Sequence, residues 1–285
     1  MNDAEALKKL QETELQILLA IAEFCDRNDI EWFMDSGTAL GAMRHGGFIP
    51  WDDDIDIGMM RDDYDRFIEL ARTGLPQGYS LQTFSSNPSF PGMFAKIYKD
   101  NTAFHTKETA EAGCDQGIFV DIFAYDTLAA DASQRARQLR TARLWQSVSY
   151  LYHAKTIVVP HKGALGAVER AACRAAHYVV RALVRRASIE KRYDRARSFE
   201  GAASDECSIL FWTAMKPCRK TDMAPPSHTL FCGHELPIAA RPETYLDNMY
   251  GEWRTLPAPE NRRTHLPEFI DFGDGTSWRA GGDAA

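Results

Sequence analysis

Apolar residues recur every three or four positions over residues 4–28, which is the spacing of one face of an α-helix. Polar and charged residues occupy most positions between them, and the pair Asn28 and Asp29 ends the pattern. The sequence therefore predicts an amphipathic helix that buries one face, whose apolar positions are Leu7, Leu10, Ile17, Leu18, Ile21, Phe24 and Cys25.

The following segment predicts a strand, a turn with the start of a helix, a second strand and a further helix. Residues 31–35 are a short strand candidate, and the glycines of SGTALGAMRHGG indicate a turn before the next helix. From Asp54 to Ile57, acidic and apolar residues alternate, as expected for a strand with one buried face. Residues 61–73 return to helical spacing, with Tyr64, Phe67, Ile68 and Ala71 on one face.

The remaining pattern predicts an α+β fold with a mixed sheet flanked by helices. Further strands are expected within 79–84, 93–100, 117–126 and 228–238. Residues 131–200 are predicted to be helical, over 135–155 and 164–187, with a break at Pro160 and Gly163. We expect residues 1–130 to form a catalytic core, residues 131–200 a helical insert, and residues 201–285 the part that completes the catalytic domain.

Composition narrows the class of protein. The 285 residues are 45% hydrophobic and 26% charged, which suits a globular protein with a sizeable core. The chain has no run of 18 apolar residues and no signal-peptide segment, so we expect a cytoplasmic protein without a membrane-spanning helix. The scattered cysteines favour free thiols, and the alternative is a zinc site built from Cys218, His228, Cys232 and His234.

Charge is distributed unevenly along the chain. Residues 131–200 hold 15 lysines and arginines against 5 acidic residues, whereas the rest of the chain holds 18 against 35. This pattern is not that of a general nucleic-acid binder, and we expect no nucleic-acid partner. It indicates an acidic catalytic body with a separate basic surface for something anionic. The basic helices are either a solvated surface or a peripheral contact with the anionic inner face of a membrane.

Four carboxylates are crowded into GGFIPWDDDIDIG, residues 46–58. Residues two apart in a strand face the same side, so Asp54 and Asp56 are expected to project together while Ile55 and Ile57 point into the core. Two convergent carboxylates suit Mg²⁺, which prefers oxygen ligands and often shares its shell with substrate phosphates. Asp121, the lone acid in an apolar strand, is the expected third ligand, because an isolated buried charge needs a partner.

Three other interpretations of these acids remain open. An EF-hand calcium loop would use Asp52, Asp54 and Asp56 at positions 1, 3 and 5, but Ile57 and Asp63 then replace its glycine and glutamate. A solvated acidic turn would leave the alternation unexplained. A structural role, in which Asp52 or Asp53 binds Arg44, His45 or backbone N–H groups, is expected for at least one of the acids.

SGTALGAMRHGG supplies the other half of a phosphate site. Gly37 permits close approach of a backbone, Thr38 offers a hydroxyl, and the N-terminus of the following helix presents unpaired N–H groups to an anion. A Gly-Thr turn about fifteen residues before an Asp-x-Asp strand resembles the nucleotidyltransferase fold. That resemblance implies a nucleotide and Mg²⁺ bound between these segments.

GTALGAMRHGGFIPWDDDIDIGMMRDDYDRF closely resembles the signature of the LicD family of phosphotransferases, whose relatives include the fukutin group. The likeness extends to FAKIYKD, GIFVDIFAYD and HELPIAARPETYLDNMYGEWRTLP. It implies transfer of a phospho-alcohol, with phosphocholine as the expected cargo, from a CDP-linked donor such as CDP-choline onto a glycan or lipid-linked glycan. Lipopolysaccharide and teichoic acid are the expected kinds of acceptor, and fukutin relatives use CDP-ribitol.

The resemblance implies a role for each matching residue. Asp54, Asp56 and Asp121 become the ligands of one or two Mg²⁺ ions, with Mn²⁺ as a substitute. Further catalytic residues are Arg44 and His45, and the residues expected to bind the donor are Gly37, Thr38, Asp52 and Lys96. The general base is Asp121, Asp53 or His45, and the candidates for contacts with choline are Trp51, Trp212, Tyr250 and Trp253. Phe119 and Ala124 depart slightly from the family pattern without touching this chemistry.

Two other functions remain as alternatives. A true nucleotidyltransferase of the same fold would move the NMP moiety of a nucleoside triphosphate to a small acceptor. A non-catalytic nucleotide-binding protein would keep the pocket alone, although such sites usually lose a metal ligand and this set of acids is intact.

Overall fold

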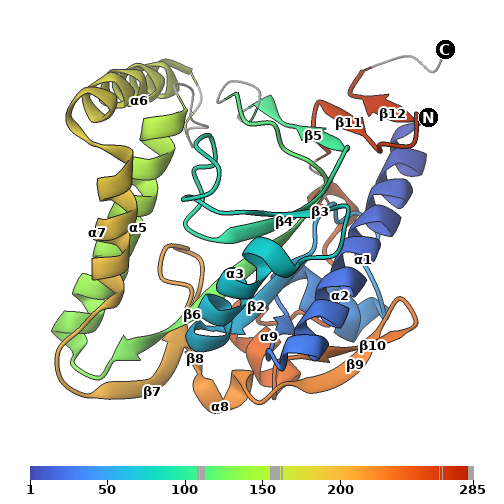
Figure 1. Ribbon diagram of the computed structural model, residues 1–285, viewed down its shortest axis with the longest axis horizontal. Helices are drawn as coiled ribbons and strands as arrows, with labels where there is room; N and C mark the ends of the chain where they lie inside the picture. Colours follow the sequence, from blue (N-terminus) through green and yellow to red (C-terminus); the bar gives the residue numbers. More distant parts are fainter. Residues whose placement is uncertain are drawn as a thin grey trace.

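A computed structural model describes residues 1–107, 109, 113–154, 161, 163–262, 264 and 266–281. Its main sheet mixes parallel and antiparallel strands, and helices flank it (Figure 1), so the predicted α+β class is confirmed. The order across this sheet is β3 (Tyr79–Gln82), β4 (Ala95–Lys99), β6 (Phe119–Ala129), β2 (Asp56–Met60), β1 (Phe33–Met34), β10 (His234–Ile238) and β9 (Ser227–Phe231).

Only two strand pairs of the main sheet are parallel among the described residues, β2 with β6 and β1 with β10. The long strand β6 continues past the sheet centre to pair with β7 (Ala203–Ser208), which in turn pairs with β8 (Cys218–Arg219). A separate small sheet joins β5 (Ala103–His105), β11 (Phe269–Asp271) and β12 (Ser277–Arg279). The C-terminal part of the chain thus adds strands to both sheets.

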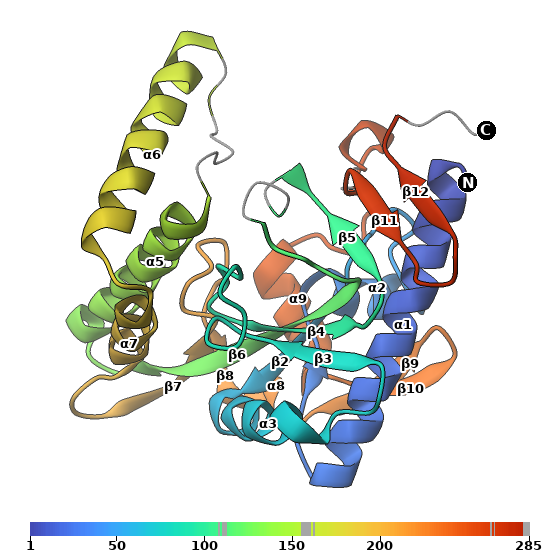
Figure 2. The same cartoon turned by 45° about the horizontal axis from the view of Figure 1, so that its top comes forward.

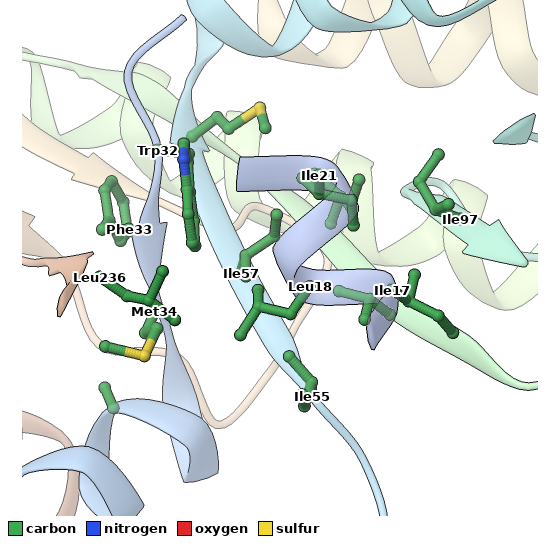
Figure 3. Packing of buried hydrophobic residues seen from close by; sticks show 14 of the residues in the cluster. Ile17, Leu18, Ile21, Trp32, Phe33, Met34, Ile55, Ile57, Ile97 and Leu236 are labelled. Carbon is green, nitrogen blue, oxygen red and sulfur yellow. The ribbon is translucent and has the colours of Figure 1, made fainter. Parts of the chain in front are cut away.

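The first predicted helix is confirmed as α1 (Asp3–Asn28). The Asn2 side chain accepts a hydrogen bond from the Glu5 N–H at 2.9 Å, and Glu5 accepts one from the Asn2 N–H at 3.0 Å, which completes a capping box. Asp29 ends the helix in the left-handed conformation at φ 52°. Figure 3 displays Ile17, Leu18 and Ile21 of α1 packed beside Ile55 and Ile57 in the main core.

The second predicted helix differs from the structure at its start. We expected a glycine turn before it, but α2 (Ser36–His45) begins directly after Asp35, which caps its first N–H. Gly37 is therefore a helical residue, and the expected turn at this point is wrong. Strand β1 is also shorter than the predicted 31–35, because Asp35 already serves as the helix cap.

Later elements lie close to their predicted places. The helix predicted over 61–73 is α3 (Arg61–Gly74), which buries Tyr64, Phe67 and Ala71. The strands predicted within 79–84, 93–100 and 117–126 are β3, β4 and β6. The C-terminal region adds α8 (Lys220–Met223), α9 (Pro242–Tyr250) and a 3₁₀ turn at Pro259–Asn261.

The basic segment contains α5 (Ala132–His153), α6 (Gly163–Leu183) and α7 (Arg186–Arg197). The long helix predicted over 164–187 ends at Leu183, and Pro160 of the predicted break lies outside the described residues. A small apolar cluster joins α5, α7 and β6, made of Leu128, Ala142, Tyr193, Ala196 and Leu210. Figure 2 shows α6 standing at the periphery, away from the main sheet. The proposed division of the chain into three parts stays a prediction.

The centre of the main sheet leaves no room for a side chain at Gly58 of β2. A Cβ atom added there would meet the ring of Phe33 and lie 2.8 Å from Cε2 of Tyr125. These two rings pack edge to face with centroids 5.2 Å apart, so neither can move without disturbing the other.

We expect Gly58→Ala to lower the free energy of unfolding by about 1–3 kcal/mol, because overpacking a dense core forces strain. Chemical denaturation followed by circular dichroism measures this loss. Gly74→Ala is the matched control, since its added Cβ would meet only the Phe24 ring, at 3.3 Å, within 4 Å. Equal stability of the two variants would contradict the expected crowding at Gly58.

Candidate functional site

Three neighbouring strands bring together residues that are far apart in the sequence. Asp56 of β2 pairs in register with Asp121 of β6, and Asp121 pairs in register with Lys96 of β4. Side chains at paired positions lie on the same face of a sheet. The sheet thus places Asp56, Asp121 and Lys96 in one row, which the sequence spacing alone did not reveal for Lys96.

Lys96 is held firmly within this row. Its Nζ lies 2.7 Å from Oδ1 of Asp121, and it also lies 3.2 Å from the centroid of the Phe119 ring. The residue is only 7% exposed. The ion pair and the ring therefore fix one positive charge beside the row of carboxylates.

The predicted alternation before and within β2 is confirmed. Ile55 and Ile57 are fully buried, whereas Asp54 and Asp56 are half-buried. The EF-hand interpretation is wrong, because Asp56 begins a strand and Asp63 lies in helix α3. The solvated-turn interpretation is also wrong, since Asp53 is only 7% exposed.

Helices α1 and α2 hold the acidic segment in place. The Thr38 hydroxyl oxygen accepts a hydrogen bond from the Asp56 N–H at 2.9 Å, and Gln11 Nε2 donates to the Asp52 carbonyl at 2.8 Å. A Cβ atom at Gly37 would lie 2.8 Å from Oδ2 of Asp52, so only glycine lets this carboxylate approach the helix. Gly37 and Thr38 thus shape the site, and their contact with a phosphate stays a prediction.

Arg44 connects the end of α2 to the C-terminal region. Its Nη1 donates to the Trp253 carbonyl at 2.8 Å, and its Nε donates to Nε2 of His45 at 3.0 Å. Burial lowers the pKa of Arg44, and the negative charge of Asp52 opposes this shift. Burial and the charge of Arg44 lower the pKa of His45.

The carboxylates repel one another in poorly solvated surroundings. Burial raises the pKa of Asp56 well above its ordinary value, and the charges of Asp54 and Asp121 raise it further. Burial raises the pKa of Asp121 to about 6, although Lys96 opposes this. Burial together with Asp54 and Asp53 raises the pKa of Asp52 to about 7. A bound cation would relieve this repulsion.

The role of Asp54, Asp56 and Asp121 as metal ligands stays a prediction. Asp56 and Asp121 are neighbours in the sheet, and the charge of Asp54 acts on both. Within the described part of the chain, no group of three or more acidic, histidine or cysteine side chains is placed to hold a metal by itself. Mg²⁺ at this site would therefore take further ligands from substrate phosphates, as it commonly does. The alternative zinc ligands Cys218, His228, Cys232 and His234 are among the described residues and do not form such a group either.

Asp35 is a residue of this region that sequence reasoning missed. It is fully buried, and its Oδ1 accepts hydrogen bonds from the Tyr125 hydroxyl at 2.8 Å, from the Ser36 N–H at 2.8 Å and from the Tyr245 hydroxyl. Its charge contributes to the raised pKa of Asp56. An acid at the end of an apolar strand, directly before a helix, was the available signal.

Two further residues near the acids were also missed. Glu14 of α1 is fully buried, and its charged neighbours are Asp54, Asp53 and Asp52. Tyr150 of α5 is 42% exposed, and its pKa is raised by burial and by the charge of Asp121. An acid within the apolar stripe of a helix signalled Glu14, whereas nothing in the sequence related Tyr150 to Asp121.

Part of this chain is similar to a known protein family and to individual members of it. Residues 29–155 match the family model described as LicD/FKTN/FKRP, nucleotidyltransferase domain. The lipopolysaccharide cholinephosphotransferase LicD of Haemophilus influenzae is 37% identical over 121 residues, which is 42% of this chain and 44% of that protein. Ribitol 5-phosphate transferase FKRP of Mus musculus is 29% identical over 77 residues, 27% of this chain and 16% of that protein.

An uncharacterized protein of Rickettsia prowazekii is 48% identical over 48 residues, 17% of this chain and 18% of that protein. Each of these matches spans less than half the length of the curated relative. The matched region 29–155 includes Asp54, Asp56, Asp121 and Lys96, whereas Glu14 lies before it.

The raised pKa values give the metal-free protein a defined pH dependence. A carboxyl group whose pKa is raised by folding binds more protons in the folded state than in the unfolded state, so stability falls as pH rises. For Asp121 and Asp52 the folded pKa values are about 6 and about 7, against an ordinary value of 3.8. In the presence of a chelator we expect the free energy of unfolding to decrease from about pH 4 to about pH 7.

Urea unfolding at several pH values measures this slope. Asp52→Asn removes one of the titrating groups, so its slope should be shallower than that of the unmodified protein. A stability that rises over this pH range in both proteins would contradict the proposed repulsion.

Proposed function

We propose that this chain, whose residues 29–155 match the family model described as LicD/FKTN/FKRP, nucleotidyltransferase domain, transfers a phospho-alcohol from a CDP-linked donor to a hydroxyl of a cell-surface glycan. The observation that carries this proposal is the row of Asp56, Asp121 and Lys96 on adjacent strands, next to Asp54. Such a site suits a diphosphate bound together with a divalent cation. Phosphocholine is the favoured cargo, because the relative from Haemophilus influenzae is named as a lipopolysaccharide cholinephosphotransferase.

The proposed reaction is a displacement at the phosphorus atom of the alcohol phosphate. The acceptor oxygen forms a bond to this phosphorus, the bond to the bridging oxygen breaks, and CMP leaves with that oxygen. The acceptor proton passes to a general base. A Mg²⁺ ion held by Asp54, Asp56 and Asp121 would offset the charge of the donor diphosphate and of the leaving CMP.

Two basic residues support the same step. Lys96, fixed 2.7 Å from Asp121, keeps a positive charge beside the carboxylates and would stabilise the negative charge of the transferred phosphoryl group. Arg44 is anchored to the Trp253 carbonyl and would bind the nucleotide phosphates. Asp121, Asp53 and His45 remain the candidates for the base, and Nε2 of His45 already accepts the hydrogen bond from Arg44.

Among the aromatic candidates for a choline contact, Tyr250 is favoured. It is 42% exposed at the end of α9, and the charges of Asp35 and Asp56 are among the causes that raise the pKa of its hydroxyl, after burial. Trp253 is only 5% exposed, and Arg262 covers the ring of Trp51 at 5.0 Å from its centroid. An exposed ring close to carboxylates suits a quaternary ammonium group.

We expect incubation with CDP-choline, Mg²⁺ and a lipopolysaccharide or teichoic acid acceptor to release CMP only when the acceptor is present. Asp56→Asn should reduce this release at least about a hundredfold, because it removes a ligand of the cation that stabilises the transition state. Asp205→Asn, at an exposed position of β7, is the control and should keep full activity.

The alternatives give different results in the same assay. Release of pyrophosphate from a nucleoside triphosphate alone would replace the proposal by a nucleotidyltransferase. Binding of CDP-alcohols without turnover would indicate a non-catalytic binder. A thermal-shift screen of CDP-choline, CDP-ribitol and CDP-glycerol with Mg²⁺ identifies the donor, because a ligand that binds only the folded state raises the melting temperature.

The basic helices are proposed as a peripheral membrane contact that serves a lipid-linked acceptor. No helix among the described residues is long and apolar enough to cross a membrane. Helix α6 instead exposes a stripe of apolar side chains between arginines, a pattern typical of helices that lie on anionic lipid. The strongly exposed members are Leu165, Val168, Tyr178, Val179 and Leu183, and the exposed arginines are Arg170, Arg174 and Arg181.

We expect the protein to float with vesicles that contain phosphatidylglycerol and to remain behind with neutral phosphatidylcholine vesicles. Val168→Glu combined with Leu183→Glu should abolish flotation, because it places negative charge on the apolar stripe. The control is Leu230→Glu, which changes a side chain on β9 that is 60% exposed. Flotation that is indifferent to lipid charge would exclude the membrane contact.

A further inference from the structure

Glu14 stands in a position where helix α1 would normally place an apolar residue. It is fully buried, and it lies on the stripe that also buries Leu10, Ile17, Leu18 and Ile21. Figure 3 displays the neighbouring part of this stripe, where Ile17, Leu18 and Ile21 pack with Ile55 and Ile57. Glu14 comes one helical turn before Leu18, so its carboxylate enters the core beside the acidic segment.

Neither carboxylate oxygen of Glu14 has a hydrogen-bond partner among the described residues. The nearest polar groups on its own helix are committed elsewhere. Gln11 Nε2 donates to the carbonyls of Ile49 and Asp52, and the Thr13 hydroxyl donates to the Lys9 carbonyl. A structural core glutamate would be expected to accept such hydrogen bonds.

Three other buried acids among the described residues each have at least one oxygen near a basic or hydroxyl group. Asp126, 4% exposed, receives two hydrogen bonds from Arg61 at 2.7 and 2.8 Å. Asp35 accepts hydrogen bonds from two tyrosine hydroxyls, and Asp121 pairs with Lys96. Glu14 differs from them, because the charged groups that act on it are the carboxylates of Asp54, Asp53, Asp52 and Asp121.

A buried carboxyl group surrounded by negative charge is strongly destabilised when it is ionised, and it takes up a proton unless a positive charge reaches it. We infer that Glu14 supplies a further negative charge to the divalent cation bound at Asp54, Asp56 and Asp121, acting from the core side of the acidic segment. This inference rests on the proposed function, since it concerns the cation of that site. It adds a residue from outside the region that matches the family model.

Glu14 also affects how helix α1 packs on the acidic segment. Without a cation, Glu14 opposes the packing of α1 on the acidic segment, and with a cation it favours that packing. Cation binding and the docking of α1 are therefore coupled, in the sense that each makes the other more favourable.

Cation affinity tests the inference without relying on catalysis. Titration of Mn²⁺, followed by electron paramagnetic resonance of the free ion, gives the dissociation constant in the presence of CDP-choline. We expect Glu14→Gln to raise this constant about tenfold or more, because a full charge near a divalent ion is lost. In the presence of a chelator, the same variant should melt at a higher temperature than the unmodified protein.

Three further variants make the result decisive. Glu12→Gln is the matched control, since it makes the same change on the solvent face of α1, where the Glu12 side chain is 62% exposed. Glu14→Met removes the charge without leaving a buried amide, and it should weaken Mn²⁺ binding as Glu14→Gln does. Asp56→Asn, a change in the proposed ligand set itself, should abolish the binding.

The outcomes separate this inference from the proposed function. If Asp56→Asn abolishes Mn²⁺ binding while both Glu14 variants bind as the unmodified protein does, Glu14 has only a packing role and the inference is overturned. If the unmodified protein binds no Mn²⁺ with or without CDP-choline, the cation site of the proposed function fails, and the inference fails with it.

Discussion

The repulsion among carboxylates at the start of β2 is the interaction on which the rest of the site depends. Asp54, Asp56 and Asp121 are held close together, and burial and like charge both disfavour the ionised forms of Asp56 and Asp121. A fold tolerates such a cluster only when other interactions fix it in place. The surrounding elements supply these interactions, and a cation bound at the cluster, as proposed, would relieve the repulsion.

The supporting interactions come from every part of the chain. Thr38 in α2 holds the Asp56 N–H, Gln11 in α1 holds the Asp52 carbonyl, and Arg44 reaches the Trp253 carbonyl near the C-terminus. Asp35 ties the start of α2 to β6 and α9 through the hydroxyls of Tyr125 and Tyr245. Helices α1 and α2, strand β6 and the C-terminal region are thus joined around the carboxylates of the site.

In the basic segment, helices α5 and α6 differ in what they contact. Helix α5 holds the loop before β4, since the Gln146 side chain accepts from the Met93 N–H at 2.9 Å and the Ser149 hydroxyl donates to the Pro91 carbonyl at 2.7 Å. Helix α6 stands at the periphery (Figure 2), and none of its described residues belongs to the main core, whereas several of its apolar side chains are exposed. The positive charge of these helices is the basis for the proposed membrane contact, separate from the proposed donor site at the acids.

The sequence by itself determined the helices and strands whose spacing of apolar residues repeats within a short stretch of the chain. The three- and four-residue spacing predicted α1, the alternation from Asp54 to Ile57 predicted which acids leave the core, and the apolar run around Asp121 predicted β6. These patterns succeed because burial of one face is set by residues close in the chain. The signature of residues 37–67 also resembles that of the LicD family, and residues 29–155 match the family model.

Only the tertiary structure decided which distant residues meet. The pairing of Asp56, Asp121 and Lys96 depends on the register of three strands, and that register arises from long-range packing that no local pattern contains. The expected glycine turn is the first turn of helix α2, because Asp35 caps that helix. A Cβ atom at Gly37 would lie 2.8 Å from Oδ2 of Asp52, a contact that the sequence alone does not reveal. Glu14 stands within the apolar stripe of α1, and only the packing of that helix placed it beside the acids, without a hydrogen-bonding partner among the described residues.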